Sequence, residues 1–281
     1  MKRKDIRVAV LRIEGTNSEA ETARCFSELG ASAELVHMNQ LDRSKVAPED
    51  FRRLEDYQAL MIPGGFSAGD YIRAGAIWAA RLKSRHAKEL EAFVAEGKPV
   101  GGICNGFQVL VEVGLLPAIG HEVMSPDPQA VLHINDSNRY ECRPVHLKHV
   151  NKGRCVATRG IRTGEVRTII ASHGEGKLLY PKDAIARILK DLEKNDQILF
   201  RYVGPDGKPA GYPWNPNGAP GDVAGITNEA GTVFGMMPHP ERVFHRYQHP
   251  DWTRDAKAKP DAAGDGRAIF EGVLRYVEKT L

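Results

Sequence analysis

Residues 97–114 read GKPVGGICNGFQVLVEVG, a short apolar run that ends at Cys104 and continues into a second apolar run with helical character. Gly102 and Gly106 flank the cysteine in a G-x-C-x-G pattern. A nucleophile elbow has this form, because the chain turns sharply from strand to helix and a Cβ at either glycine position would collide. The stretch therefore predicts a strand, a tight turn and a helix, with the Cys104 thiol pointing into the crevice beyond the strand's carboxyl end.

The helix N-terminus that follows Cys104 favours the thiolate, which is the nucleophilic form of a cysteine. A buried structural cysteine is the alternative, because free cysteines are usually core residues. That structural role is the one expected for Cys25, Cys142 and Cys155. The four cysteines lie far apart without a CxxC pair, and residues 1–15 read as a first strand rather than an export signal. We therefore expect reduced thiols in the cytoplasm and no disulfide framework.

The N-terminal half alternates strand and helix signals. Apolar runs that end in glycine or a polar turn predict buried parallel strands at residues 6–13, 57–65 and 97–104. A helix is predicted over 16–30, with Thr16 or Asn17 as its N-cap and Gly30 as its stop. A second helix is predicted over 86–97. The expected buried positions of the two helices are Ala20, Ala23, Phe26 and Leu29, and then Leu90, Phe93 and Val94.

The C-terminal half reads differently. Closely spaced β-like segments between residues 129 and 201 predict antiparallel strands, followed by a helix over about 182–193. Two strands joined by NEAG (228–231) predict a hairpin, and residues 265–281 predict an amphipathic helix. We expect one domain over residues 1–281, of the α/β class. Its sheet should be doubly wound and mostly parallel, with a small antiparallel β segment.

The composition excludes several kinds of partner. Lys and Arg total 39 against 36 Asp and Glu, so the net charge is +3 and no basic block predicts nucleic-acid binding. No run approaches the roughly 20 apolar residues that span a bilayer, so no membrane is expected. The sequence is long enough to bury a sizeable core without staples.

A thiolate nucleophile needs a base and a group that orients the base, and MMPHPE (236–241) supplies both. In an extended segment, side chains at i and i+2 leave on the same face, so Glu241 is expected to hold one ring nitrogen of His239 while the other faces Cys104. Backbone N–H groups at Gly64, Gly65 and Asn105 are candidates for binding an oxyanion, because glycine permits close approach. A tight turn is the alternative for the glycine pair.

The strings PGGF, GICNGFQVL and PHPE, in this order, resemble the class I (triad-type) glutamine amidotransferases. Longer strings, MIPGGFSAGDYIRAGAIWA, ICNGFQVLVEVGLLP, ASHGEGKL and MMPHPERVF, are similar to the branch of that family formed by the glutaminase subunits of phosphoribosylformylglycinamidine synthases. The match covers nearly all of the chain. The family's fold agrees with the doubly wound sheet predicted above.

This resemblance implies that Cys104 attacks the carboxamide carbon of glutamine, that His239 relays protons and that Glu241 orients His239. Gln108 would help to seat the glutamine, and an exposed glutamine without that role is the alternative. The partners implied are a synthetase subunit, which would bind ATP and Mg and make formylglycinamidine ribonucleotide, and a small accessory subunit. ASHGEG around His173 is a family signature to which the sequence assigns no chemical step. The segments YPWNPNGAPG and 245–266 read as extra loops.

No cofactor is expected in this chain itself, because GxGxxG and a phosphate-binding lysine loop are absent from the sequence. His146 with His149, and His245 with His249, have spacings that could ligate a metal, but neither pair lies in a Cys/His cluster, so no metal is predicted. Two other functions stay open at this point. One is an elbow-cysteine hydrolase of the protease, chaperone or deglycase type, and the other is a non-catalytic scaffold subunit.

Overall fold

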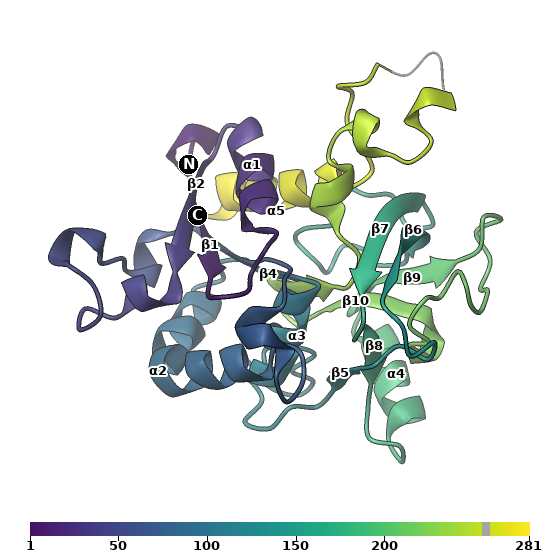
Figure 1. The fold of residues 1–281 in the computed structure, drawn as a ribbon, viewed down its shortest axis with the longest axis horizontal. Helices are drawn as coiled ribbons and strands as arrows, with labels where there is room; N and C mark the ends of the chain where they lie inside the picture. Colours follow the sequence, from purple (N-terminus) through teal and green to yellow (C-terminus); the bar gives the residue numbers. More distant parts are fainter. Residues whose placement is uncertain (255–258) are drawn as a thin grey trace.

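The computed structural model describes residues 1–254 and 259–281, and they form an α/β fold around one large sheet (Figure 1). The nine strands of that sheet lie in the order β2-β1-β3-β4-β11-β10-β9-β6-β7. The first five run parallel to one another: β2 (Ser32–His37), β1 (Arg7–Arg12), β3 (Ala59–Ile62), β4 (Val100–Ile103) and β11 (Val233–Met236). The other four continue the sheet with antiparallel pairing: β10 (Val223–Thr227), β9 (Ile198–Val203), β6 (Glu141–His149) and β7 (Val166–His173).

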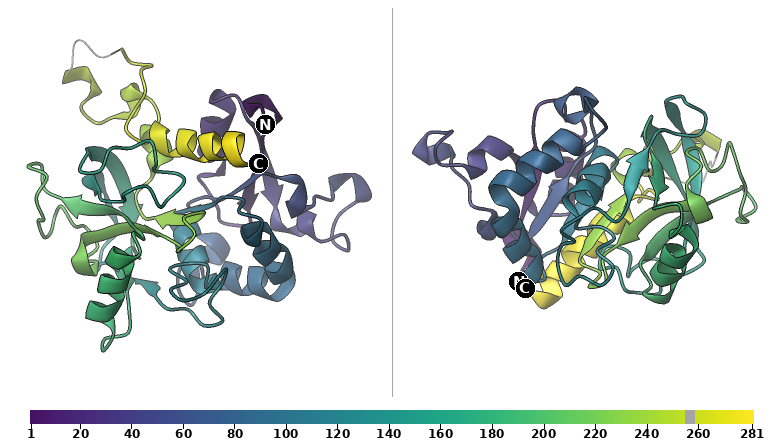
Figure 2. Two further views of the ribbon diagram at one scale, coloured as in Figure 1. Left: turned by 180° about the vertical axis from the view of Figure 1, so that it is seen from behind. Right: turned by 90° about the horizontal axis from the view of Figure 1, so that it is seen from below.

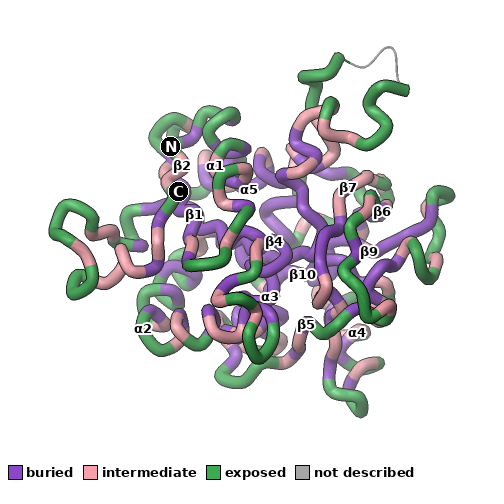
Figure 3. Tube along the Cα trace, in the orientation of Figure 1, coloured by how far each residue is buried: buried purple, intermediate pink, exposed green. Residues whose placement is uncertain are grey.

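Helices cover both faces of the parallel strands. The helices are α1 (Glu19–Glu28), α2 (Ala76–Ala95), α3 (Asn105–Val113) and α5 (Arg267–Thr280). Figures 1 and 2 show α1 and α5 together on one side and α2 and α3 on the other. Phe26 of α1 packs edge-on against Phe270 of α5, with ring centroids 5.3 Å apart. The parallel strands β1, β3, β4 and β11 are buried along most of their length, as Figure 3 shows. The prediction of a doubly wound, mostly parallel sheet is confirmed.

The antiparallel half also agrees with its sequence pattern. β6 and β7 pair over eight residues, and β10 and β11 form the expected hairpin around NEAG. A separate pair of short strands, β5 (Val131–His133) and β8 (Lys177–Leu179), precedes α4 (Ile185–Lys194). Residues 212–219 form a loop, as predicted. The second predicted loop, 245–266, has only short 3-10 turns in its described part, and its residues 255–258 lie outside the described residues.

Three local predictions were wrong. The first helix begins at Glu19 after Ser18, rather than after Thr16 or Asn17, and Ala20 lies on its exposed side. Helix α2 begins at Ala76, ten residues before the predicted start. The sequence did not reveal this start, because the residue before it is Gly75, which has no side chain to cap the helix. The predicted start, His86, is instead a kink inside α2, with φ −130° and ψ 19°.

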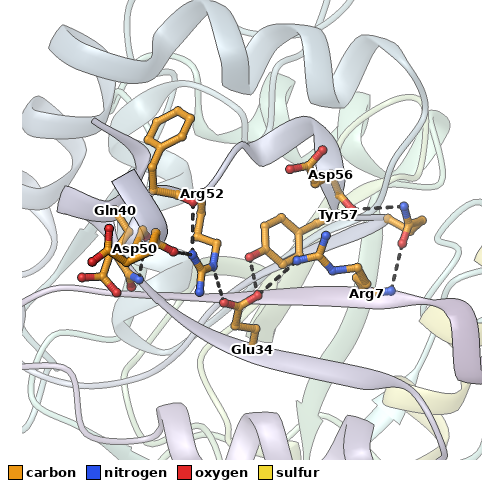
Figure 4. A network of polar contacts seen from close by, with 10 residues as sticks. Arg7, Glu34, Gln40, Asp50, Arg52, Asp56 and Tyr57 are labelled. Atoms are coloured by element: carbon orange, nitrogen blue, oxygen red, sulfur yellow. Dashed lines mark hydrogen bonds and ion pairs between the residues drawn. The ribbon is translucent and has the colours of Figure 1, made fainter. Parts of the chain in front are cut away.

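Strand β2 had no signal in the sequence, because it lies at the edge of the sheet and only Val36 in it is buried. Polar contacts hold it instead (Figure 4). The Glu34 carboxylate accepts hydrogen bonds from Arg52 Nε at 2.5 Å and Tyr57 Oη at 2.6 Å, and from Arg7 Nη2 at 3.3 Å. Charge-assisted bonds of this kind replace the apolar packing that central strands have. None of the described helices is long and apolar enough to cross a membrane.

Candidate active site

Cys104 occupies the turn between β4 and α3, at the carboxyl edge of the sheet. Its backbone has φ 52° and ψ −109°, outside the regions that L-residues prefer. Its amide donates to the Met236 carbonyl of the neighbouring strand at 2.8 Å, which fixes the turn. A Cβ on Gly102 would lie 2.6 Å from the Gly106 carbonyl oxygen, and a Cβ on Gly106 would lie 1.9 Å from that of Ile62. The steric reason for the G-x-C-x-G pattern is therefore confirmed.

His239 and Glu241 follow β11, the strand beside β4. His239 Nδ1 lies 2.5 Å from Glu241 Oε1, and both side chains are almost completely buried. The His239 amide donates to the Ile170 carbonyl of β7 at 2.8 Å. The predicted contact between His239 and Glu241 is present, but the prediction that an extended segment produces it was wrong. The chain enters a 3-10 turn at Pro240 (Pro240–Val243), and that turn brings Glu241 to the ring.

The charge of His239 follows from this burial and from its neighbours. Burial alone would lower the pKa of His239, but the negative charges of Glu241 and Cys104 outweigh it and raise that pKa to about 10. The other ring nitrogen, Nε2, has no hydrogen-bond partner among residues 1–254 and 259–281. Cys104 is 6% exposed, and its Sγ lies 3.6 Å from the Ser172 carbonyl oxygen. The arrangement places an imidazolium beside a sulfur nucleophile.

The glycine pair after β3 lies against this histidine. A Cβ on Gly64 would be 2.7 Å from His239 Cε1 and 3.4 Å from Cys104 Cβ, so only glycine lets the two side chains come this close. Gly65 has φ +156°, and the loop that follows β1 packs against it. The Gly64 carbonyl accepts from the amides of Asn17 and Ser18, both at 3.2 Å. The predicted oxyanion glycines are thus next to the nucleophile.

The side chains of Asn105 and Gln108 are engaged with the protein. Asn105 is fully buried: its Oδ1 accepts from the Ser67 amide at 3.2 Å, and its Nδ2 donates to Gln108 Oε1 at 2.8 Å. Gln108 Nε2 donates to the Glu175 carbonyl at 2.6 Å. The Asn105 amide belongs to the first turn of α3, where N–H groups have no partner inside the helix. Gln108 therefore fixes the segment after β7, and one N–H and one lone pair of its amide remain for a ligand.

A cavity of about 220 Å³ joins these residues. Its walls include Gly65, Cys104, Gln108 and His239 from the predicted set, but not Gly64, Asn105 or Glu241. Asp70, His173 and Glu175 also line it, and the sequence analysis gave none of them a role. Their signal was the family strings that contain them, since Asp70 lies in MIPGGFSAGDYIRAGAIWA and His173 and Glu175 lie in ASHGEGKL. A larger cavity of about 450 Å³, between residues 41–55 and α2, contains no cysteine.

The described residues contain no group of three or more His, Cys, Asp or Glu side chains that could hold a metal ion. His245 Nε2 instead contacts Glu28 Oε2 at 2.6 Å, and His146 Nδ1 contacts Thr168 Oγ1 at 3.2 Å. The cavity around Cys104 therefore presents a thiol, an imidazole and carboxylates, which suit acyl transfer through a covalent sulfur intermediate.

Known proteins share both this chain's sequence and its fold. The family model of the CobB/CobQ-like glutamine amidotransferase domain matches residues 5–277. The phosphoribosylformylglycinamidine synthase subunit PurQ of Archaeoglobus fulgidus is 48% identical over 280 residues, which cover 99% of this chain and 100% of that protein. The subunit of the same name from Picrophilus torridus is 43% identical over 242 residues, 86% of this chain and 89% of that protein. A chain in the structure of PurLQS from Thermotoga maritima matches with a TM-score of 0.68 at 28% identity, over 97% of this chain and 99% of that one.

Proposed function

This chain belongs to the family of CobB/CobQ-like glutamine amidotransferase domains, and on that premise we propose that Cys104, His239 and Glu241 hydrolyse glutamine. The function is that of the glutaminase subunit of a phosphoribosylformylglycinamidine synthase, because relatives with that name match nearly the full chain. The observation that carries the proposed roles is the strained elbow at Cys104 beside the buried His239–Glu241 pair. A protease, chaperone or deglycase of similar fold would not need this histidine and glutamate after the last parallel strand.

The first half of the reaction forms a thioester. The Cys104 thiolate attacks the carboxamide carbon, a C–S bond forms, and the carbonyl electron pair moves onto oxygen. His239, charged at neutral pH, donates a proton to the nitrogen as the C–N bond breaks, so that ammonia leaves. Glu241 keeps the ring oriented and stabilises its positive charge through the Nδ1 contact.

The second half releases glutamate. Water attacks the thioester carbon, His239 accepts a proton from the water, and the C–S bond breaks to regenerate the Cys104 thiolate beside the His239 imidazolium. Both halves pass through a negatively charged oxygen. We assign its stabilisation to the amides of Gly65 and Asn105, with Gly64 supplying the space that brings His239 up to Cys104. Gln108 acts by holding the cavity wall at Glu175.

The ammonia is used elsewhere. We propose that a synthetase subunit, with ATP and Mg bound to it rather than to this chain, consumes the ammonia to convert formylglycinamide ribonucleotide to the amidine. A small accessory subunit completes the proposed complex. The name PurLQS of the similar Thermotoga maritima structure supports an assembly of more than one subunit. The scattered, unpaired cysteines fit a cytoplasmic enzyme of purine biosynthesis.

The nucleophile assignment is tested by Cys104→Ala, with Cys142→Ala as the matched control because Cys142 is exposed and outside the elbow. We expect Cys104→Ala to lose glutamine hydrolysis while keeping its fold and synthetase binding, since the thiol faces a cavity. Cys142→Ala should keep wild-type activity. A glutamine-derived diazoketone should alkylate Cys104, as mapped by mass spectrometry. An adduct at Cys25, Cys142 or Cys155 instead would overturn the assignment.

A further inference from the structure

The second oxygen of the Glu241 carboxylate lacks a hydrogen-bond donor. Glu241 is 1% exposed, and its Oε1 contacts His239 Nδ1. Its Oε2 is buried and has no hydrogen-bond partner among residues 1–254 and 259–281. A buried, charged oxygen without a donor is costly, because the hydrogen bonds that it made to water are lost and not replaced. The orientation of Glu241, and through it that of His239, therefore depends on what donates to Oε2.

A second, small cavity of about 30 Å³ reaches Glu241. None of the described residues that line it also lines the catalytic cavity, so the two cavities are separate. Its walls come from α1, which packs against the turn at Pro240–Val243, and from the segment that follows this turn. A cavity of this size with polar walls holds about one water molecule. The polar lining includes Glu21, Arg24, Glu28, His245 and Gln248.

His245 brings a second unpartnered atom to this small cavity. Its Nε2 lies 2.6 Å from Glu28 Oε2, and since a carboxylate only accepts, Nε2 carries a proton. Its ring stacks on Tyr247, with ring centroids 5.1 Å apart and an angle of 12° between the planes. Its Nδ1 is buried and has no partner among the described residues. In the neutral ring Nδ1 is therefore an acceptor, as Glu241 Oε2 is.

Two buried acceptors that border one small cavity require an occupant with two donors. A water molecule has two O–H groups and can donate to both acceptors at once. If His245 is protonated, the same water accepts from Nδ1 and still donates to Glu241. Gln248 ties the two residues together, because its Nε2 lies 3.5 Å from the Glu241 carbonyl oxygen and its Oε1 accepts from the His245 amide at 2.8 Å.

We propose that His245, held by Glu28, is a positioning residue that fixes the Glu241 carboxylate through one bridging water molecule. The inference rests on the proposed glutaminase function and extends the contacts of His239 and Glu241 outward to α1. It also gives a function to the first residue of the segment 245–266, which its sequence indicates only as an extra loop. His245 does not line the catalytic cavity, so its effect belongs to the rate of the chemical step and not to glutamine binding.

Three substitutions, assayed in complexes with the synthetase subunit, separate the water bridge from the Glu28 contact. His245→Phe keeps a ring that stacks on Tyr247 and removes both nitrogens. We expect its kcat for glutamine hydrolysis to fall about 10- to 100-fold with KM unchanged, as when a group that orients a catalytic side chain is lost. His245→Asn places an amide where Nδ1 lies, so it should keep most of the wild-type kcat. His245→Gln places its amide near Nε2 and Glu28 instead, so it should be as slow as His245→Phe.

Two further measurements do not depend on turnover. In a high-resolution crystal structure of the wild-type chain we expect one water molecule within hydrogen-bond distance of Glu241 Oε2 and His245 Nδ1. The His239 Nδ1 proton should give a downfield NMR resonance that broadens in His245→Phe and persists in His245→Asn. His249→Phe is the matched control, because His249 lies in the same segment but lines neither cavity. It should keep the wild-type kcat and the wild-type resonance.

Several outcomes would overturn the inference. A wild-type kcat for His245→Phe would show that His245 does not position Glu241. Equal rates for His245→Asn and His245→Gln, or a faster His245→Gln, would assign the effect to the Glu28 contact and not to a water bridge. A metal ion in the small cavity, or no water there, would also refute it. Absence of glutamine hydrolysis by the wild-type complex would instead refute the proposed function, and the crystal structure and the NMR resonance would still test the bridge.

Discussion

At the scale of single residues, Glu241 determines the charge state on which the proposed chemistry depends. It is buried with His239, and no other carboxylate approaches that ring within hydrogen-bond distance among the described residues. An imidazolium persists in so buried a place only because a negative charge lies beside it. In the proposed mechanism, Glu241 therefore both orients the ring and keeps a proton available for the leaving ammonia.

Glu241→Gln should fold but react slowly. The neutral amide keeps the shape and can accept from Nδ1, yet it removes the charge that raises the pKa of His239. We expect glutamine hydrolysis to fall by roughly 10³- to 10⁴-fold, the scale of a comparable loss in a serine protease triad. The His239 pKa, measured by NMR titration of the ring protons, should fall. A wild-type rate in this variant would remove Glu241 from the proposed triad.

The same substitution should change how stability depends on pH. The folded-state pKa of His239 is raised above its ordinary value of 6.5, so the pairing with Glu241 stabilises the fold fully below pH 6.5. That contribution is lost as the pH rises towards about 10. The free energies of unfolding of wild type and Glu241→Gln, measured in urea, should therefore differ more at pH 6 than at pH 10. An equal difference in unfolding free energy at both pH values would contradict a stabilising ion pair between His239 and Glu241.

At the scale of elements, the site depends on glycines at the ends of two neighbouring strands. Gly102 and Gly106 let α3 begin against the sheet, and Gly64 lets His239 approach Cys104. Such positions are readable in sequence, because a glycine at a fixed offset from a cysteine has a steric reason. The elbow, the hairpin at NEAG and α5 were predicted on grounds of this local kind.

Other features had no local signal. The proximity of Asp70 to Glu175 depends on the pairing of strands far apart in the chain, and nothing near either residue predicts it. Strand β2 is an edge strand held by Glu34, and the start of α2 has no side-chain cap. The turn at Pro240 replaces the extended segment that was expected before Glu241. Local patterns therefore predicted the residues to which we assign the reaction, and tertiary contacts determined which residues surround them.

Gly64→Ala tests the contact between the β3 loop and the histidine. The new Cβ would lie 2.7 Å from His239 Cε1, closer than such atoms approach, and the buried ring is held on its other side by Glu241. We expect the ring to be displaced and hydrolysis to fall about 10²-fold, as for small misplacements of catalytic groups. Gly211→Ala is the control, since a Cβ there meets nothing within 4 Å. A wild-type rate for Gly64→Ala would show that the ring moves without cost.

At the scale of the whole molecule, the cavity is assembled from every part of the chain. The loops after β1 and β3, the elbow after β4, the segment after β7 and the turn after β11 all reach the carboxyl edge of one sheet. The chain adds β2 on one side of β1 and β3 on the other, so the order of the strands switches between β1 and β3, beside this site. Ligand sites in α/β sheets commonly lie at such a switch point. Because the nine strands form one continuous hydrogen-bonded sheet, we infer that residues 1–281 fold as a single domain.

The loop of residues 66–75 borders this cavity and carries backbone strain on its solvent side. Ala68, Asp70 and Ile72 all have positive φ, between 52° and 76°. Tyr71 is 74% exposed and Ile72 is 85% exposed, so two apolar side chains project next to the mouth of the cavity. A strained backbone with exposed apolar groups is suited to change conformation when a partner covers it. Gly65, immediately before the loop, carries the amide assigned to the oxyanion.

We therefore expect the isolated chain to be a poor glutaminase that becomes competent on the synthetase, because docking on this loop would align the Gly65 amide. A missing oxyanion donor costs roughly 10²- to 10³-fold in rate, enough to keep the lone subunit nearly silent. Such control prevents ammonia from escaping as unreactive ammonium when no acceptor is ready.

Steady-state glutaminase activity should be measured for the chain alone, with synthetase, and with synthetase, ATP and acceptor nucleotide. Ile72→Glu should weaken the activation while iodoacetamide labelling of Cys104 stays unchanged. Full activity of the chain alone, unaltered by the partner, would refute the coupling.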